Sequence, residues 1–224
     1  DGHTGIEHAL PVAPLYKDVT TVFAKSDVGY TPTLIVCYGG LMGENYWYMK
    51  SNVWEDARLL TYVPRSIVDA RSRRRMMAAE DDWHHIDVSR SVKAIVDAGG
   101  RAQLGAHGQL QGLGAHWELW MLAQGGMTPL QAIRCATLYG AAYIGLDKDL
   151  GSLEVGKLAD LVVMDRDPLE NIRNSESVRY VMQNGRLFDA ATMNQIGNHP
   201  SARAPFYWEG GTDPGAATTF EGVE

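Results

Sequence analysis

Short apolar segments that favour β-strands alternate, in the first 150 residues, with segments in which apolar residues recur at helical spacing. The strand-like segments are 5–10, 31–37 and 101–106, and the helical segments are 11–25 and 86–98. Such alternation is typical of parallel βα units, in which a helix connects one strand to the next. The sequence therefore predicts an α/β fold with a parallel sheet, interrupted by an insertion over about residues 38–82.

Two more helices are predicted before the pattern changes near Gly151. The first covers about 115–124. The second begins at Thr128-Pro129, because threonine is a good N-cap and proline suits the first helical turn, and it runs to about Gly145.

The rest of the chain has the character of a small β unit. Residues 157–165 are predicted to form a strand, and 178–188 a hairpin, because Asn184-Gly185 favours a type I′ turn. From about residue 198 to 224 the chain is rich in Gly, Pro, Ala and Thr, and we expect an extended tail.

Composition excludes some classes of protein. The net charge is −7, whereas a nucleic-acid binder usually has a basic excess, so no nucleic-acid partner is expected. No apolar stretch reaches the roughly 18 residues of a membrane span, so no membrane partner is expected either. Cys37 and Cys135 lie in apolar runs, which indicates free buried thiols. The chain begins at Asp1 without a Met, and the sequence does not indicate a compartment.

Three segments resemble the C-terminal half of the amidohydrolase superfamily, in particular its imidazolonepropionase-like and dipeptidase-like members. Residues 151–168 read GSLEVGKLADLVVMDRDP, residues 127–137 read MTPLQAIRCAT, and residues 5–8 read GIEH. They occur in the family's order, and the first of them is a long and specific motif. The resemblance implies a metal-dependent hydrolase that uses a divalent cation, typically Zn²⁺.

The family fold is a (β/α)8 TIM barrel beside a small β-sandwich. The resemblance implies barrel strands six, seven and eight at 5–9, 31–37 and 101–106, and the C-terminal share of the sandwich at 157–188. The expected units are therefore a partial barrel at 1–150, part of the sandwich at 151–197 and a tail at 198–224. Strands one to five and their His-x-His motif are not in this sequence. We expect a fragment, inactive alone, that associates with a missing N-terminal half or with copies of itself.

Two histidines are the main candidates for the site. His8 matches the family's metal ligand on strand six, at the strand end where barrel active sites are built. His107 stands where the family usually has an aspartate that binds metal and acts as base. A histidine can ligate a metal or accept a proton, but it cannot do both with one nitrogen. Either His107 serves in an altered mechanism or the activity is lost. The motif gives His3 no role, so a surface or outer position is expected.

Three further residues are candidates for binding substrate: His116, after the glycine-rich 108–114 loop, and Tyr38 and Trp47, in the insertion. Because the insertion follows a strand end, its aromatic residues could form a lid, or they could pack only on one another. Glu118 is interpreted as a carboxylate near a helix start, and His84-His85 as surface residues.

The sequence suggests one hydrolytic chemistry, attack by a metal-activated water, since the Gly-x-Ser-x-Gly motif of serine hydrolases is absent. The expected function is hydrolysis of a C–N bond in a small molecule, either a cyclic amide or a dipeptide-like substrate. The alternative is a catalytically impaired barrel that serves as a binding or structural domain.

Overall fold

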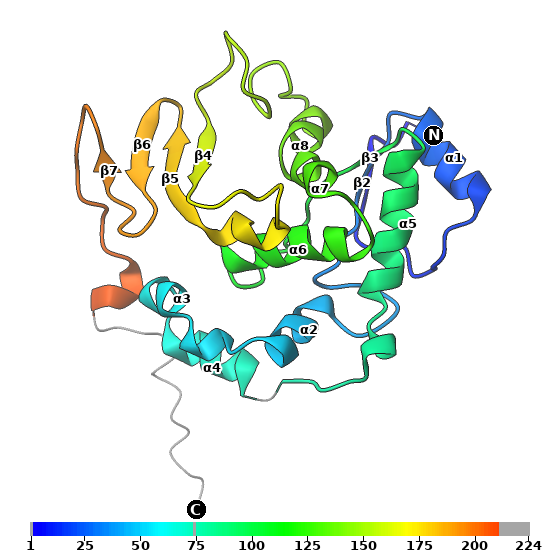
Figure 1. Ribbon diagram of the computed structural model, residues 1–224, viewed down its shortest axis with the longest axis horizontal. Coiled ribbons are helices and arrows are strands. Elements are labelled where there is room, and N and C mark those ends of the chain that lie inside the picture. Colours follow the sequence, from blue (N-terminus) through cyan, green and yellow to red (C-terminus); the bar gives the residue numbers. More distant parts are fainter. Residues whose placement is uncertain (1, 74, 211–224) are drawn as a thin grey trace, which may run out of the picture.

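The protein contains two separate sheets in the computed structural model, which describes residues 2–73 and 75–210. The parallel sheet has strands β1 (Gly5–Glu7), β2 (Gly29–Thr31) and β3 (Arg101–Ala102) in the order β1-β2-β3. Helices α1 (Lys17–Lys25) and α5 (His85–Asp97) pack against each other beside this sheet, as Figure 1 shows. The prediction of an α/β fold with parallel strands is confirmed.

The parallel strands are shorter than the sequence predicts. The segment expected as a strand at 31–37 contributes only Thr31, because Pro32 has no amide to donate and Thr33 adopts a left-handed conformation with φ of 50°. The amides of Val36 and Cys37 then both donate to the carbonyl of Thr33, which makes a turn. The strand predicted at 101–106 likewise ends at Ala102.

Two predicted helices have different bounds. The helix predicted at 11–25 begins at Lys17, because Pro11 and Pro14 lack the amides that a helix needs and disfavour helical backbone before them. The helix predicted at 128–145 is divided into α7 (Pro129–Ala136) and α8 (Leu138–Tyr143) at Thr137, whose φ and ψ are −131° and −94°. The predicted cap is present, since the Thr128 hydroxyl accepts from the amide of Gln131.

The insertion is helical throughout its regular parts. It contains α2 (Gly43–Lys50), the 3-10 helix η1 (Val53–Glu55), α3 (Ala57–Tyr62), α4 (Arg65–Ser72) and the 3-10 helix η2 (Glu80–Asp82). In α2 the side chains of Trp47 and Tyr48 pack inward: Trp47 is 3% exposed and lies against Trp117 and Trp120 of α6 (Leu113–Gln124).

The second sheet is antiparallel and four-stranded. Its strands are β4 (Leu161–Met164), β5 (Val178–Gln183), β6 (Arg186–Asp189) and β7 (Gln195–Ile196), and the 3-10 helix η3 (Ile172–Glu176) precedes β5. The β5–β6 hairpin is confirmed, and Asn184 and Gly185 both have the positive φ of a type I′ turn. The sequence did not predict β7.

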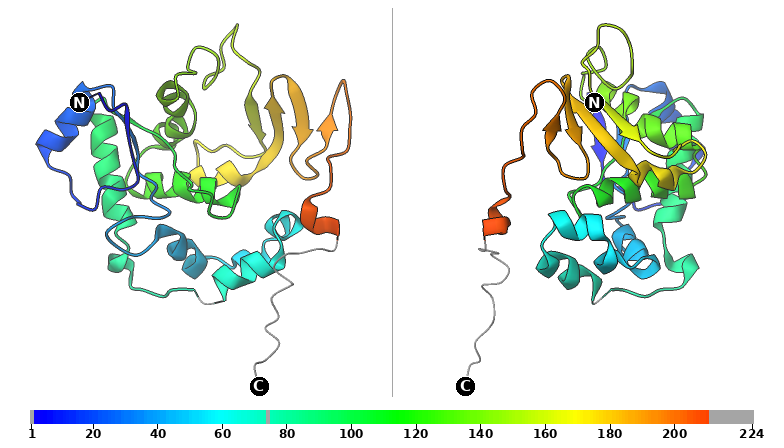
Figure 2. Two further views of the ribbon diagram at one scale, coloured as in Figure 1. Left: turned by 180° about the vertical axis from the view of Figure 1, so that it is seen from behind. Right: turned by 60° about the vertical axis from the view of Figure 1, so that its left-hand side comes forward.

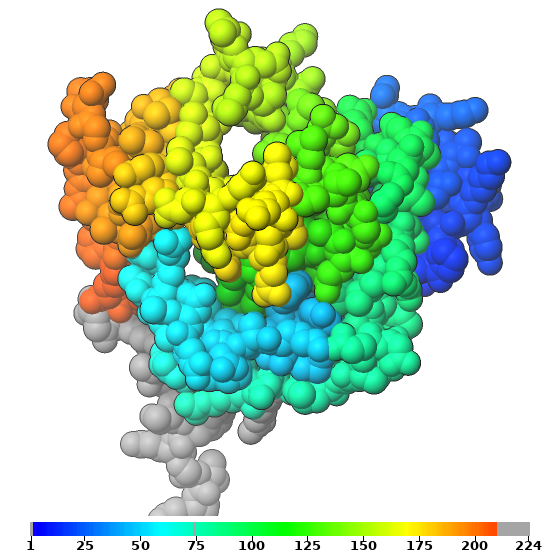
Figure 3. Space-filling model, in the orientation of Figure 1, coloured from blue at the N-terminus to red at the C-terminus, as the bar shows by residue number. Residues whose placement is uncertain are grey.

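Neither face of the antiparallel sheet is well covered. Val162 and Val163 point to opposite faces of β4 and are 50% and 41% exposed. Figure 3 shows an opening between this part of the chain and helices α7 and α8, and the left view of Figure 2 shows the sheet standing apart from the parallel one. The core therefore lies elsewhere, around α5 and α6, where Val92, Ile95 and Leu122 are fully buried.

The segment predicted as a tail is described as far as residue 210. Ser201 forms a bridge with Gln195, and residues Tyr207–Gly210 form the 3-10 helix η4, so this part is not merely extended. Residues 211–224 lie outside the described part of the chain. Cys37 and Cys135 are free and buried, as expected. Over the described ranges, no helix has the length and apolar character needed to cross a bilayer.

Candidate metal and catalytic site

Three of the predicted site residues gather at one edge of the parallel sheet. His8 follows β1, Tyr38 lies in the loop after β2, and His107 lies in the loop after β3. Because the strands are parallel, their carboxyl ends meet at the same edge. Loops that leave three different strands thus converge on one place.

The rings of these residues are in contact. The His8 ring stacks on the Tyr38 ring, with centroids 4.8 Å apart and planes 4° from parallel. The His107 ring meets the His8 ring edge to face, with centroids 5.0 Å apart. Tyr38 is 51% exposed, so the cluster of these three rings, the imidazole cluster, opens to solvent on the tyrosine side.

Unusual backbone directs both imidazoles. His8 has a φ of 69° and His107 a φ of 52°, in the left-handed region that residues other than glycine rarely adopt. Cys37, next to Tyr38, has a φ of 49°. Such conformations cost of order 1–3 kcal/mol each and cluster at functional sites. Their occurrence in all three loops suggests that ring placement here has been favoured over local backbone stability.

The two histidines differ in their hydrogen bonds. Nδ1 of His107 lies 3.0 Å from Oε1 of Gln109, which leaves its other nitrogen free to face a ligand. Nδ1 of His8 is buried and has no hydrogen-bond partner in the protein. A buried polar atom without a partner costs free energy, so His8 has a nitrogen suited to a ligand that the polypeptide does not itself supply.

A carboxylate lies close to the imidazole cluster. Glu44 lies in the first turn of α2 and is 8% exposed, with Oε2 3.2 Å from Nη1 of Arg71. Burial raises the pKa of Glu44, whereas the charges of Arg71 and His107 lower that pKa. The loop after β2 therefore brings a negative charge within electrostatic reach of His107. Sequence reasoning missed Glu44 and Gln109, and only the position of Gln109 two residues after His107 could have signalled a role.

His116 and Trp47 are not brought into the imidazole cluster. Nδ1 of His116 lies 3.0 Å from Oγ of Ser175 in η3, and burial followed by the charge of Arg58 lowers the pKa of His116. Trp47 is enclosed by other aromatic rings and by the guanidinium of Arg173, 5.1 Å from its ring centroid. Of the two interpretations of the insertion, these contacts favour aromatic residues that pack on one another. His3 is exposed, as expected.

Two interpretations of polar residues are wrong. Glu118 does not lie at a helix start: it is in the second turn of α6, fully buried, and its carboxylate accepts hydrogen bonds from two backbone amides of the loop after β2. His85 is not a surface residue, because its side chain turns inward from the first turn of α5 and is fully buried, although His84 beside it is exposed. Adjacent helical residues face different directions, which the dipeptide alone does not reveal.

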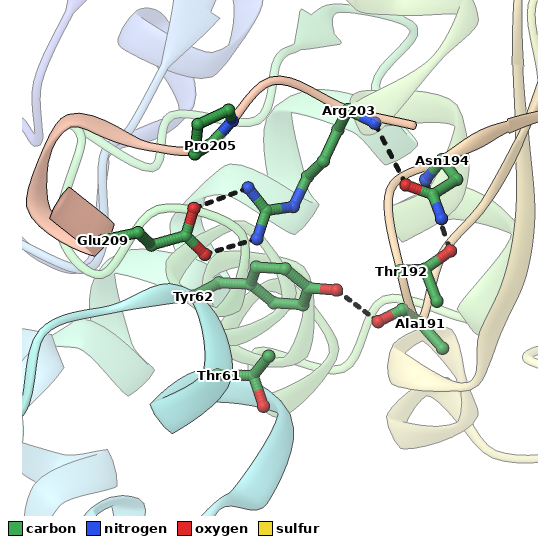
Figure 4. A pocket seen from close by; sticks show the side chains of 8 residues that line it. All are labelled: Thr61, Tyr62, Ala191, Thr192, Asn194, Arg203, Pro205 and Glu209. Atoms are coloured by element: carbon green, nitrogen blue, oxygen red, sulfur yellow. Dashed lines mark hydrogen bonds and ion pairs between the residues drawn. The ribbon is translucent and has the colours of Figure 1, made fainter. Parts of the chain in front are cut away.

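Another depression lies far along the chain from the imidazole cluster. Figure 4 shows its lining, in which the hydroxyl of Tyr62 donates to the carbonyl of Ala191 and Arg203 forms an ion pair with Glu209. The charged groups are thus already paired with each other. This depression lies between α3, the β6–β7 loop and the segment after β7, and its lining contains no histidine or cysteine.

Comparison with known proteins places the chain in a family. The model of the amidohydrolase family matches residues 49–188, which is more than half of the chain. The chain belongs to the amidohydrolase family. The match includes α6, α7, β4 and most of the β5–β6 hairpin, so it covers the two longer motifs on which the resemblance was based.

Individual relatives agree with this assignment. Ochratoxinase from Aspergillus niger is 27% identical over 176 residues, which cover 73% of this chain and 36% of ochratoxinase. Imidazolonepropionase from Symbiobacterium thermophilum is 51% identical over 39 residues, 17% of this chain and 9% of that protein. This amidohydrolase chain therefore spans about a third of the length of ochratoxinase.

Solved structures show the likeness in fold. An amidohydrolase structure matches with a TM-score of 0.56 at 23% identity, over 84% of this chain and 40% of the other. A Xaa-Pro dipeptidase with bound methionine matches with a TM-score of 0.53 at 22% identity, over 83% of this chain and 39% of the other. Both matches extend over most of this chain but over less than half of each relative.

The described residues of this amidohydrolase fit part of a metal site. Two imidazoles in contact, one with an unpartnered buried nitrogen, are the donor chemistry that Zn²⁺ takes. A catalytic zinc usually has three protein ligands and a water, however, and residues 2–73 and 75–210 include no group of three His, Cys, Asp or Glu side chains that could hold a metal ion. His8 and His107 would therefore be two ligands of a larger set.

Proposed function

We propose that this chain forms the closing part of a (β/α)8 hydrolase barrel that cleaves a C–N bond in a small molecule. One observation carries the proposal: His8 and His107 lie in contact at the carboxyl edge of a parallel sheet. Members of the family that resemble this chain are named ochratoxinase, Xaa-Pro dipeptidase and molinate hydrolase. The substrate class we propose is accordingly an amide or dipeptide-like bond in a small molecule.

The remaining strands of the barrel would come from other residues of the same protein or from a partner. Strand β1 and strand β3 each have a neighbour on one side only in the described chain, so two strand edges are free to pair. The antiparallel sheet would likewise gain a cover from an associated segment, as half of a small sandwich. A homo-oligomer is a second way of covering the same edges.

In this proposal His8 would hold a divalent metal, most simply Zn²⁺, together with ligands from the rest of the protein. When bound, such a metal activates water and polarises a carbonyl. Three roles belong to residues of this chain. Gln109 orients the His107 ring, and the Tyr38 ring fixes the plane of the His8 ring. The exposed face of Tyr38 offers an aromatic surface to the substrate. His107 acts either as ligand or as proton carrier.

Metal content of the full-length protein tests the proposal. The variants are His8→Asn and His107→Asn, since asparagine tolerates the left-handed backbone of both sites, and the matched control is His84→Asn at an exposed position. Elemental analysis after dialysis against zinc should show bound metal in the wild type and the control and a large loss in His8→Asn. Loss of metal in His107→Asn would make His107 a ligand, whereas retained metal with lost hydrolysis would make it a proton carrier. Hydrolysis of a panel of dipeptides and N-acyl amino acids should fall in both test variants.

A second function is favoured by one specific observation. By the resemblance described above, His107 stands where the family usually has an acid that binds metal and acts as base. The alternative is therefore a barrel that binds a small molecule without cleaving it. A full-length protein that folds normally, takes up no metal and hydrolyses nothing in the panel would establish this alternative and reject the hydrolase.

A further inference from the structure

Glu118 is the most completely buried acidic residue of the described chain, and its carboxylate has a defined task. Oε1 accepts a hydrogen bond from the amide of Leu34, and Oε2 accepts one from the amide of Ile35, both at 2.8 Å. The side chain has no exposed surface. One carboxylate on α6 thus holds two successive peptide groups of the loop after β2.

The two amides need such an acceptor. Leu34 and Ile35 are fully buried, so water cannot satisfy their backbone groups. The strand has ended at Thr31, so no sheet partner accepts from them either. Adjacent amides that point the same way are matched by a carboxyl group, because each of its two oxygens can accept a hydrogen bond.

The loop held in this way leads directly to the imidazole cluster. After Ile35, the amides of Val36 and Cys37 donate to the carbonyl of Thr33 at 3.0 Å, and this turn delivers the Tyr38 ring onto His8. Only Val36 and Cys37 separate Ile35 from Tyr38, so a shift of the Ile35 backbone should also shift the Tyr38 ring.

The same loop also fixes the start of the insertion. The carbonyl of Ile35 accepts from the amide of Glu44 at 2.9 Å. A Cβ at Gly43 would lie 2.2 Å from the carbonyl oxygen of Leu34, so the first turn of α2 is packed directly on the loop. Glu118 therefore sits behind both Tyr38 and Glu44, the two groups that this loop presents near the histidines.

We propose that Glu118 is a positioning residue for the imidazole cluster: by holding the amides of Leu34 and Ile35 it sets the ring of Tyr38 on the ring of His8. What the cluster does rests on the proposed function, but the positioning does not. It can be tested whether or not the protein hydrolyses anything.

The test is an NMR measurement on the full chain, with the ring protons of His8 as the reporter. Stacking under Tyr38 shifts these protons upfield, and Tyr38→Leu defines the value without the stack. Glu118→Gln retains the size of the side chain. Glutamine has one acceptor oxygen, and its amide NH2 group cannot accept a hydrogen bond from the second backbone amide. We expect Glu118→Gln to move the His8 protons most of the way to their value in Tyr38→Leu. The double variant should add little further change, because both substitutions act through one contact.

A matched control separates positioning from general loss of stability. Leu122→Ala removes a fully buried side chain from the same helix and should destabilise the protein while leaving the His8 protons at their wild-type value. If Glu118→Gln is folded and its His8 protons also stay at the wild-type value, the proposal is overturned.

A second route to the loop covers the case in which Glu118→Gln does not fold. Gly43→Ala pushes on the Leu34 carbonyl from the opposite side and should displace the same ring of Tyr38. In the wild-type chain itself, the amides of Leu34 and Ile35 should exchange with solvent as slowly as those in the middle of α6. Rapid exchange of either amide would alone refute the proposal, whereas absence of metal binding or hydrolysis would refute only the proposed function.

Discussion

Protonation of His85 should lower the free energy of unfolding in mild acid, and His85→Phe should remove this contribution. The imidazole is fully buried at the start of α5, with Nε2 3.1 Å from Oε1 of Gln124 and the Tyr46 and Trp83 rings packed around it. Burial lowers the pKa of His85 from its ordinary value of 6.5 to about 4, because the charged ring would lose its hydration. Phenylalanine retains the aromatic packing and cannot be protonated.

The lowered pKa of His85 determines whether its protonation raises or lowers the free energy of unfolding. The unfolded chain takes up the proton below about pH 6.5 and the folded chain only near pH 4, so the free energy of unfolding decreases as pH falls through this window. The full difference amounts to about 3 kcal/mol, since one pKa unit is worth 1.36 kcal/mol. Between about pH 7.5 and about pH 5, roughly 2 kcal/mol of this should be lost.

Urea denaturation at the two pH values measures the effect, and the comparison must be made against wild type. Burial raises the pKa of Glu118 to about 8, so that carboxyl favours folding at low pH and acts in the opposite direction. The wild type should lose about 2 kcal/mol more than His85→Phe between pH 7.5 and 5. His84→Phe, at the exposed neighbouring position, should behave as wild type does. Equal losses in wild type and His85→Phe would show that the buried ring accepts its proton without penalty.

Three other destabilising substitutions, the first with a control at an exposed leucine, have expected outcomes that calorimetry or denaturant titration can check. Leu122→Ala should cost 2–5 kcal/mol, roughly, because it empties a fully buried position, while Leu153→Ala at an 80% exposed position should stay within about 0.5 kcal/mol of wild type. Trp120→Phe should cost about 1–3 kcal/mol, because the indole Nε1–H donates to the carbonyl of Ile172 and to the hydroxyl of Ser175, and both acceptors would lose this donor. Gly185→Ala should cost about 1–2 kcal/mol, since φ there is 76°; a neutral result for any of these three would contradict the packing, bonding or backbone reasoning behind it.

Periodicity and turn chemistry predicted the local elements of the fold well. Thr128-Pro129 begins a helix, Asn184-Gly185 turns a hairpin, and α5 lies where the apolar spacing placed it. These features depend on neighbours in sequence, so the sequence contains them. The end of strand β2 could not be predicted in the same way. The amides of Leu34 and Ile35 donate to the side chain of Glu118, more than 80 residues away, and not to a neighbouring strand.

The candidate site was predictable where it lies at strand ends and unpredictable where it depends on tertiary packing. His8, Tyr38 and His107 each follow a strand, and parallel strands bring such positions together. Trp47 and His116 were chosen for chemical type and proximity in sequence. The Trp47 side chain is instead buried in the core, and the His116 ring lies against Ser175 of η3. An aromatic residue in an insertion can face a pocket or a core, and its sequence neighbours do not distinguish the two.

Helix α6 makes the two sheets dependent on each other. One of its sides holds the loop after β2 through Glu118, and another packs Trp117 and Trp120 against the insertion and η3, which leads into β5. Neither sheet has a hydrophobic core of its own that would stay packed after α6 unfolds. Heat should therefore melt the parallel and antiparallel halves together, as one cooperative transition, even though they stand apart in space.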